Sequence, residues 1–353
     1  MNYSLFLSIM MKFLFPLVCL LSACTARDNG VKKNNIDFSK FPAVINPVFK
    51  NVIITDNGVI GAMYLTDSTI LAYDWRGTNG NFFNEYSLKT TKLVATYLPL
   101  GRTSGKTLGA ISTGFFKDAI WMFVINLKKI ISLKLNQSKF KPIVYNELPF
   151  SKFYYSLQFI DSLKVIGNGY YETPNTIQEI ELLTQKVTAD YGKPDDPPVG
   201  VPQYAWKRAN EGFSALKPDG KKLVIAHLWS DKLEIFNLKN KTRILVSGPQ
   251  NAAAEFHSFK SDRQDVIQKT DKSIHAFSTV FATDNYIYAL YSGNNMSSPY
   301  INYGKRIFVY NWEGKPVREI NFNDYASCFT VSSDDKVLYI YNVLTKFIMA
   351  ASL

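Results

Sequence analysis

From about residue 43 to its end, the chain alternates short apolar runs with polar turns. The runs are rich in Val, Ile, Tyr and Phe, which favour β-strands. The turns carry Asp, Asn, Gly and Pro, which accept the backbone conformations that tight turns need. The clearest copy is residues 213–226, where Pro218-Asp219-Gly220 separates two apolar runs. This pattern predicts an all-β chain built from hairpins.

Two kinds of hairpin alternate along the chain. The first kind is predicted at residues 51–64, 111–124, 155–166, 213–226, 278–290 and 328–341. The second kind, with a turn rich in Lys, Thr and Asn, is predicted at residues 85–94, 133–142, 180–187, 235–244 and 308–317. One hairpin of each kind makes four strands, which is one blade of a β-propeller.

The last blade is one strand short, because only residues 346–352 follow the sixth first-kind hairpin. The apolar stretch 43–49 can supply the missing outer strand. Such a strand would pair an edge that is otherwise exposed. We therefore expect a six-bladed β-propeller over residues 43–353, with its ring closed by pairing an N-terminal strand into the last blade.

The N-terminal stretch has the anatomy of a secretory signal. Lys12 precedes an apolar run, and Leu21-Ser22-Ala23-Cys24 then has the form of a bacterial lipobox. This predicts a lipoprotein signal peptide over residues 1–23, lipidation of Cys24, and a flexible tether over residues 24–42. An ordinary secretory signal is the alternative. The absence of a basic residue before Met10 favours translation from Met10 or Met11.

The predicted location is the cell envelope. The resemblance to Gram-negative lipoproteins, in which Asp after the lipidated Cys implies retention in the inner membrane, implies that Thr25 favours the outer membrane. The resulting lipid anchor would hold the chain to the membrane without a transmembrane helix. Whether the domain faces the periplasm or the cell surface stays open.

Composition removes several classes of function. Lys and Arg exceed Asp and Glu by 40 to 29, a net charge of +11, but no run of five basic residues appears, so we expect no nucleic-acid partner. After processing, Cys328 would be the only Cys beside the lipidated Cys24. We expect it to be a small buried hydrophobe in a monomer without cofactors.

Candidate catalytic and metal-binding groups are few. Five Asp residues could offer oxygen ligands, but each lies at a hairpin turn, where a solvated turn residue is the simpler interpretation: Asp56, Asp161, Asp219, Asp284 and Asp334. His227 and Asp231 could form an acid–base pair, but four residues along a strand span about 13 Å. We therefore assign no catalytic and no metal-binding residues.

Two insertions interrupt the blade pattern, and long loops on rigid scaffolds often carry function. Residues 192–212 are Pro-rich, and residues 248–272 contain helix formers that predict a short helix. Aromatic, cationic and amide side chains in and near the first insertion suit sugar or peptide recognition. The predicted ligand-binding residues are Tyr204, Trp206, Arg208, Asn210, Trp229 and His227. Alternatively, Trp206 only packs the insertion, and His227 belongs to the core or rim.

The segments 218–223 and 334–339, Pro-Asp-Gly-Lys-Lys-Leu and Asp-Asp-Lys-Val-Leu-Tyr, resemble those of TolB-like six-bladed propellers. With the lipobox, the chain is similar to the TolB-like propeller lipoproteins of Gram-negative gut-type bacteria. This resemblance implies a six-bladed fold and an envelope location, and it brings no catalytic residues. The expected function is a non-enzymatic binding or scaffold module for a protein, peptide or glycan. A propeller-type hydrolase or lactonase with a site in the central channel, and a structural role in an envelope assembly, are the alternatives.

Overall fold

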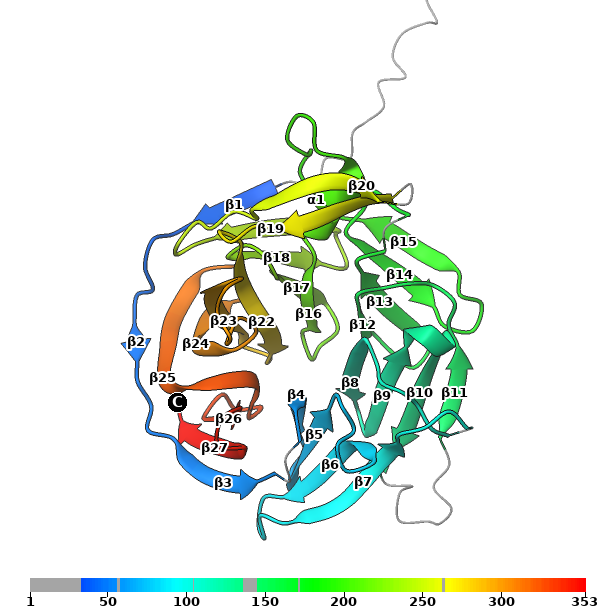
Figure 1. Cartoon of the computed structure of the whole chain (residues 1–353), viewed down its shortest axis with the longest axis vertical. Helices are drawn as coiled ribbons and strands as arrows, with labels where there is room; N and C mark the ends of the chain where they lie inside the picture. Colours follow the sequence, from blue (N-terminus) through cyan, green and yellow to red (C-terminus); the bar gives the residue numbers. More distant parts are fainter. Residues whose placement is uncertain (1–32, 56–57, 104, 136–144, 171, 262–263) are drawn as a thin grey trace, which may run out of the picture. The chain divides into compact units, whose positions relative to one another are not determined.

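The structure is a computed structural model that describes residues 33–353 apart from 56–57, 104, 136–144, 171 and 262–263. The predicted signal peptide, Cys24 and Asp56 lie outside the described residues. Strands dominate, and the helical elements described are α1 (Gln203–Ala209) and the 3-10 helix η1 (Ile125–Leu127). Sheets follow one another around a common centre (Figure 1). The predicted all-β propeller fold is confirmed.

Four sheets each contain one antiparallel four-stranded unit. The first unit is β4 (Ile60–Leu65), β5 (Thr69–Asp74), β6 (Asn81–Ser87) and β7 (Leu93–Pro99). The second is β8 (Ser112–Phe116), β9 (Ala119–Val124), β10 (Lys129–Lys134) and β11 (Asn146–Pro149). The third is β12 (Ser156–Phe159), β13 (Lys164–Asn168), β14 (Ile177–Glu181) and β15 (Val187–Tyr191). The fourth is β16 (Gly212–Leu216), β17 (Lys222–His227), β18 (Lys232–Asn237) and β19 (Thr242–Ser247).

The remaining large sheet has eight strands and is organised around one long strand, β25 (Pro316–Val331). Its first part pairs with β24, and its last part pairs with β26. The other strands of this sheet are β2 (Val44–Ile45), β3 (Lys50–Ile54), β22 (Ile274–Ala282), β23 (Tyr286–Asn295), β24 (Gly304–Asn311), β26 (Val337–Asn342) and β27 (Phe347–Ser352). The sheet thus contains two four-stranded units that share β25.

Apolar packing between neighbouring units forms the core. The second strand of a unit is covered on both faces, and β17 is buried along Leu223–His227. The first strands of successive units contact one another in the order β4, β8, β12, β16, β22, β25, and β25 also contacts β4. Covering both faces of each sheet with apolar side chains removes more apolar area from water than one face could.

The predicted hairpin at residues 51–64 is wrong. Its first half, β3, pairs antiparallel with β27, whereas its second half, β4, begins another sheet. The stretch 43–49, which was expected to supply the outer strand, contributes only Val44–Ile45, in parallel with β25. Strands that follow one another in sequence look like a hairpin, and the sequence pattern does not reveal that they belong to different blades.

The compact unit also begins earlier than predicted. Lys33–Asp37 form β1, which adds a fifth, parallel strand to the edge of β19. Phe41, which follows β1, is buried in the core. Residues 33–42 are therefore part of the folded domain rather than of the predicted flexible tether, and the compact unit spans Lys33–Leu353.

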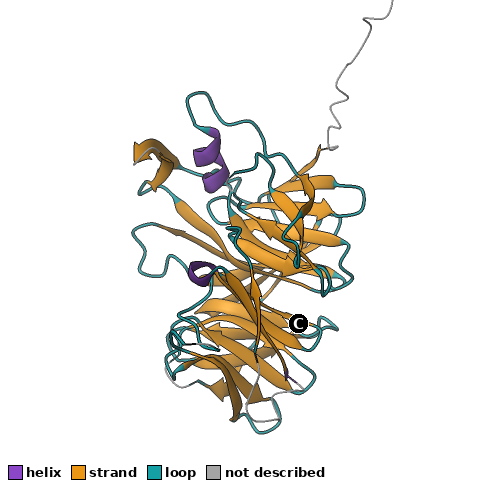
Figure 2. Cartoon of the chain, turned by 90° about the vertical axis from the view of Figure 1, so that its right-hand side faces the viewer, coloured by secondary structure: helices purple, strands orange, loops and turns teal. Residues whose placement is uncertain are grey.

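The insertions differ from their predicted structure. The expected helix in residues 248–272 is replaced by a hairpin of β20 (Phe256–Ser261) and β21 (Gln264–Lys269), and the helix α1 lies in the first insertion instead. The apolar residues Phe256 and Phe259 are three positions apart, so the sequence does not show the two-residue alternation that would have predicted this strand. In the side view both helices lie on the same side of the sheets (Figure 2).

Two sides of the propeller can be defined from the connections. We call the side with the turns that join first to second strands and third to fourth strands the turn face. Backbone bonds link such turns, for example Leu238 N–H to Lys221 O at 2.9 Å. The opposite side, with α1 and the β20–β21 hairpin, is the insertion face. In the described part of the chain, no helix is long and apolar enough to cross a membrane.

Candidate functional site

A cavity of about 770 Å³ lies where the first strands of the blades meet. Side chains from β4, β8, β12, β16, β22 and β25 all contribute to its wall. Because every unit presents its first strand to this cavity, a ligand here could be contacted by the whole propeller at once. Clefts of this volume at a convergence of elements are common ligand sites.

The cavity wall is mostly uncharged. Tyr64 and Thr113 join two neighbouring strands through a 2.9 Å hydrogen bond between their hydroxyl groups. Gln158 donates its amide N–H to Ser214 O at 2.7 Å. Burial raises the pKa of Tyr64 well above its usual range, so its phenol stays neutral. Such a wall suits neutral ligands, which lose little hydration when they enter it.

Charged groups occur at the turn-face end of the cavity. They are Lys117, Lys217 and Asp219. Lys217 and Asp219 form an ion pair at 2.9 Å, and the pKa of Asp219 is lowered because the pair and the backbone N–H of Lys221 outweigh its burial. At another part of the wall, the rings of Tyr155 and Phe213 lie 6.1 Å apart. The wall therefore combines aromatic surface with hydroxyl and amide groups.

The first insertion is fixed to the propeller by Lys207, which projects from α1 into the third blade. Its ammonium group donates to the carbonyl oxygens of Tyr170, of Thr173 at 2.7 Å and of Asn175 at 2.6 Å. Burial lowers the pKa of Lys207 to about 8, and Asp190 opposes this shift. Three donors matched to three carbonyls give the helix a defined position.

The other predicted binding residues of this insertion lie on or beside α1. Trp206 is half-buried, packs against Phe256 at 6.4 Å and donates its indole N–H to Asp195 O at 2.8 Å. Tyr204 and Arg208 are half-buried on the same helix. Asn210 ends the helix and donates its side-chain N–H to Trp206 O at 2.9 Å. These four residues therefore lie close together, and the contacts of Trp206 hold the insertion in place.

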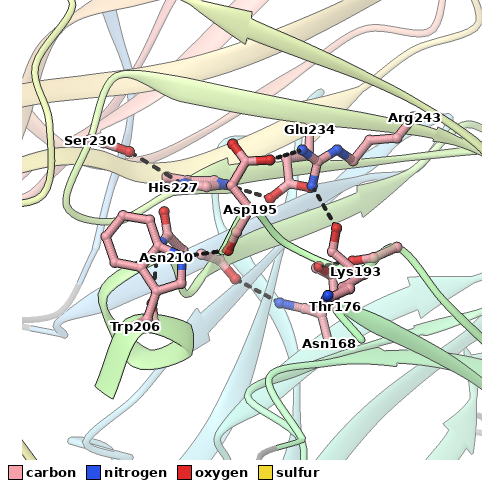
Figure 3. Close-up of polar contacts among 12 residues, drawn as sticks. Asn168, Thr176, Lys193, Asp195, Trp206, Asn210, His227, Ser230, Glu234 and Arg243 are labelled. Atoms are coloured by element: carbon pink, nitrogen blue, oxygen red, sulfur yellow. Dashed lines mark hydrogen bonds and ion pairs between the residues drawn. The ribbon is translucent and has the colours of Figure 1, made fainter. Parts of the chain in front are cut away.

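His227 belongs to a buried polar chain that Figure 3 displays. Its Nε2 donates to Glu234 at 2.9 Å, and Ser230 lies 3.2 Å from its Nδ1. Glu234 also pairs with Arg243 at 3.0 Å, and Arg243 reaches Asp195 at 3.3 Å. Burial alone would raise the pKa of Glu234, but the His227 hydrogen bond and the Arg243 charge lower it below its ordinary value.

The order Ser230, His227, Glu234 is that of a hydrolase triad. However, His227 is 2% exposed, Ser230 is 1% exposed, and neither lines the central cavity. A nucleophile must reach its substrate, so these hydrogen-bonded side chains act as a structural link between strands. Asp231, the other residue considered as a partner of His227, instead accepts the backbone N–H groups of Gln250 and Ala252, each at 2.8 Å.

Trp229 lies in a small aromatic and basic cluster. The ammonium of Lys269 sits 4.0 Å from the centre of its ring, and His275 meets it edge-on at 5.5 Å. Burial lowers the pKa of Lys269 to about 8 and that of His275 to about 4. Glu211 and Arg208 also act on Lys269, which places the ends of the two insertions close together.

The turn aspartates act as turn residues in this structure. Asp161 accepts the backbone N–H of Leu163 at 2.7 Å, and Asp219 accepts that of Lys221 at 2.9 Å. Within residues 33–353, leaving out the undescribed positions, no three His, Cys, Asp or Glu side chains lie close enough to hold a metal ion. Cys328 is buried, and burial raises the pKa of its thiol to about 12.

Comparison with protein families identifies the fold. The family model described as TolB-like 6-blade propeller-like matches residues 61–334. The chain belongs to this TolB-like propeller family. The predicted resemblance is therefore confirmed at the level of the family, and the match extends from the first described blade to the turn at Asp334. A comparison with curated proteins finds no match.

Two solved structures similar to this TolB-like chain share little sequence identity with it. The structure of U3-55K shares 8% identity, covers 86% of this chain and 98% of its own, and has a TM-score of 0.50. The Myceliophteria thermophila Cps50 (Swd1) β-propeller domain shares 11% identity, covers 87% of this chain and 100% of its own, and has a TM-score of 0.48. At this identity the likeness concerns the fold alone.

The sequence pattern did not single out Glu234, Arg243 or Lys207. The available signal was a Glu inside the apolar strand Lys232–Asn237, since a charge among buried positions needs a partner. The partner comes from the next strand, nine residues later, and cannot be identified from spacing alone.

Proposed function

We propose that this protein is a lipid-anchored, non-enzymatic binding module of the cell envelope, which takes a peptide, protein segment or glycan into its central cavity from the insertion face. The observation that carries the proposal is the cavity of about 770 Å³ walled by all the first strands. Its neutral wall of aromatic, hydroxyl and amide groups suits stacking on sugars or peptide side chains and hydrogen bonding to their polar groups.

A rigid ring is part of this proposal. In this proposal the four separate units and the two halves of the eight-stranded sheet count as six blades, in keeping with the family description. The pairing of β3 with β27 supports closure of the ring by an N-terminal strand. In a closed ring the last blade has its full set of paired strands where the two ends of the chain meet. The cavity therefore keeps one shape when the ligand is absent.

The insertion face supplies the entry in this proposal. Tyr204, Trp206, Arg208 and Asn210 lie together on the first insertion, and Trp229 lies in the cluster with Lys269. His227 is buried, so its role is to support the fourth blade under this entry. A side chain on a fixed helix contacts a ligand at lower entropic cost than one on a flexible loop.

The proposal is tested by ligand capture with cavity-filling variants. The processed wild-type protein is applied to arrays of envelope glycans and of peptides, together with Ala62→Trp and Ala215→Trp, which fill the cavity from β4 and β16. The matched control is Ala43→Trp, an exposed alanine outside the cavity. We expect both cavity variants to lose binding at least tenfold while they keep the melting temperature of the control.

Three outcomes would contradict the proposal. The first is that no array member binds the wild-type protein, and the second is equal binding by folded cavity variants. The third is turnover of a lactone, ester or glycoside that the cavity variants abolish, which would assign the hydrolase alternative. The anchor is tested separately, because labelled palmitate should enter the wild-type chain and be lost in Cys24→Ala.

A further inference from the structure

We infer that the turn face of the third and fourth blades rests on the phospholipid headgroups of the anchoring membrane, with Leu163 and Leu183 in the interface. The inference rests on the lipid anchor of the proposed function. It adds a contact surface and an orientation, in which the insertion face points away from the membrane.

The first observation is the end of the propeller at which the N-terminal segment enters. β1 runs parallel to β19 and pairs Lys33 with Arg243 and Asp37 with Ser247. Arg243 follows the turn between β18 and β19, which belongs to the turn face. Lys33 therefore lies at the turn face, and the chain then runs along the fourth blade toward the insertion face.

The length of chain before Lys33 limits how far the domain can stand from an anchor. Cys24 precedes Lys33 by nine residues, which is 33 minus 24. Fully extended, nine residues span about 30 Å. The two faces are separated by the length of a blade strand, which is about 20 Å for the six residues of β19, and the segment joins the domain at the turn face. A lipid on Cys24 would thus keep the turn face of the fourth blade nearer to the membrane than the insertion face.

The second observation is the pair of exposed leucines on this face. Leu163 is 53% exposed and Leu183 is 71% exposed, in the two turns of the third blade. These turns are joined by a bond from Leu182 N–H to Leu163 O at 2.7 Å. Two adjacent leucines in water are unfavourable, and the headgroup–acyl boundary of a bilayer removes them from water.

The third observation is that exposed lysines lie on the same turns as these leucines and on the neighbouring blade. Lys164 and Lys186 follow the leucines in sequence, and Lys239 and Lys241 lie in the turn of the fourth blade. The first-strand turns of these two blades are neighbours, because Gly220 lies beside Ile160 O. Lysines on the same face as an apolar tip can place their ammonium groups on lipid phosphates while the leucines enter the interface.

The leucine–lysine patch can be probed with an environment-sensitive fluorophore on the full acylated chain. Leu183→Cys is labelled with nitrobenzoxadiazole, and Leu344→Cys, a site on the insertion face that is 58% exposed, is the control. Cys328 is buried and should not react. Each protein is placed in phosphatidylcholine vesicles with and without about 30% phosphatidylglycerol. This anionic lipid attracts basic protein segments.

We expect a blue shift and quenching by lipid-attached spin labels at position 183 and neither at position 344. Lys239→Glu with Lys241→Glu should reduce the quenching at least threefold in anionic vesicles, and Lys193→Glu on the insertion face should leave it unchanged. Absence of a shift at position 183, or an equal shift at position 344, would overturn the inference.

The two proposals fail separately. Palmitate incorporation reports the anchor, array binding reports the cavity, and the probe at position 183 reports the orientation. An acylated, ligand-binding protein without a shift at position 183 overturns only the orientation. If the chain is not acylated and its probe shows no shift on vesicles, both the anchor and the orientation are overturned, while cavity binding is still measured by the arrays.

Discussion

The ammonium nitrogen of Lys207 lies 2.6 Å from the backbone carbonyl oxygen of Asn175. This contact joins the helix of the first insertion to a loop of the preceding blade, and two further carbonyls complete the surroundings of the ammonium. Lys207 thus fixes the insertion to the blade. Its removal would leave buried carbonyl groups without a hydrogen-bond donor.

Lys207→Met is expected to lower the free energy of unfolding by about 3 kcal/mol, because three buried carbonyls lose a charged donor. Urea denaturation at pH 7 measures this change. Lys207→Arg should not restore stability, since a planar guanidinium cannot direct three donors to the same carbonyls. Lys193→Met in the same insertion is the control, because that side chain is 64% exposed and should change stability by less than about 0.5 kcal/mol. Equal effects at both positions would contradict the assigned role of Lys207.

Glu234→Gln is expected to destabilise the protein by about 3 to 5 kcal/mol, because it removes the buried carboxylate beside Arg243 and leaves the exposed Asp195 as the remaining charged partner. Glu313→Gln, on an exposed turn, should cost less than about 1 kcal/mol. The double variant Glu234→Leu with Arg243→Met removes both charges together. Its loss of unfolding free energy should be smaller than the sum of the losses in Glu234→Leu alone and Arg243→Met alone. Additive costs in urea denaturation would show that the pair is not coupled.

Stability should fall with acid through the titration of His275. Burial lowers the pKa of this imidazole to about 4 in the folded protein, whereas the unfolded chain titrates near 6.5. Between these values the unfolded state binds more protons, so stability rises with pH and is lost as pH falls from 6.5 toward 4. By pH 4.5 the loss from this group is about 2 to 3 kcal/mol.

The contribution of His275 can be isolated from that of the carboxylates. The drop in unfolding free energy between pH 7 and pH 4.5 is measured for the wild type and for His275→Gln. We expect the variant to lose about 2 kcal/mol less over this range, because its side chain does not titrate. The same drop in both proteins would place the acid sensitivity elsewhere.

Two neighbouring isoleucines test the place of β3 in the eight-stranded sheet. Ile53 is fully buried opposite Ile348 of β27, whereas Ile54 is 63% exposed. Ile53→Ala should lower the free energy of unfolding by about 2 to 4 kcal/mol through the lost burial and the cavity that remains. Ile54→Ala should change it by less than about 0.5 kcal/mol. Similar losses at the two positions would mean that β3 does not pack as described.

Most of the hairpins follow from sequence because both halves of a hairpin are local. The turn Pro218-Asp219-Gly220 and the apolar runs around it are enough to place β16 and β17, since Gly220 adopts a positive φ of 70° that glycine accepts without strain. The TolB-like family could be named from the same segment together with the turn at Asp334.

What the sequence did not determine are pairings between distant segments. The same alternation that correctly predicted β16 and β17 joined β3 to β4, although β3 pairs with β27 almost three hundred residues later. The partners of His227 and Lys207 likewise come from other strands and another blade. Turn residues and the alternation of apolar and polar positions determine where strands form. Which strands become neighbours is determined by the free energy of covering each sheet on both faces. The cavity, the insertion face and the leucine–lysine patch exist only once that selection has been made.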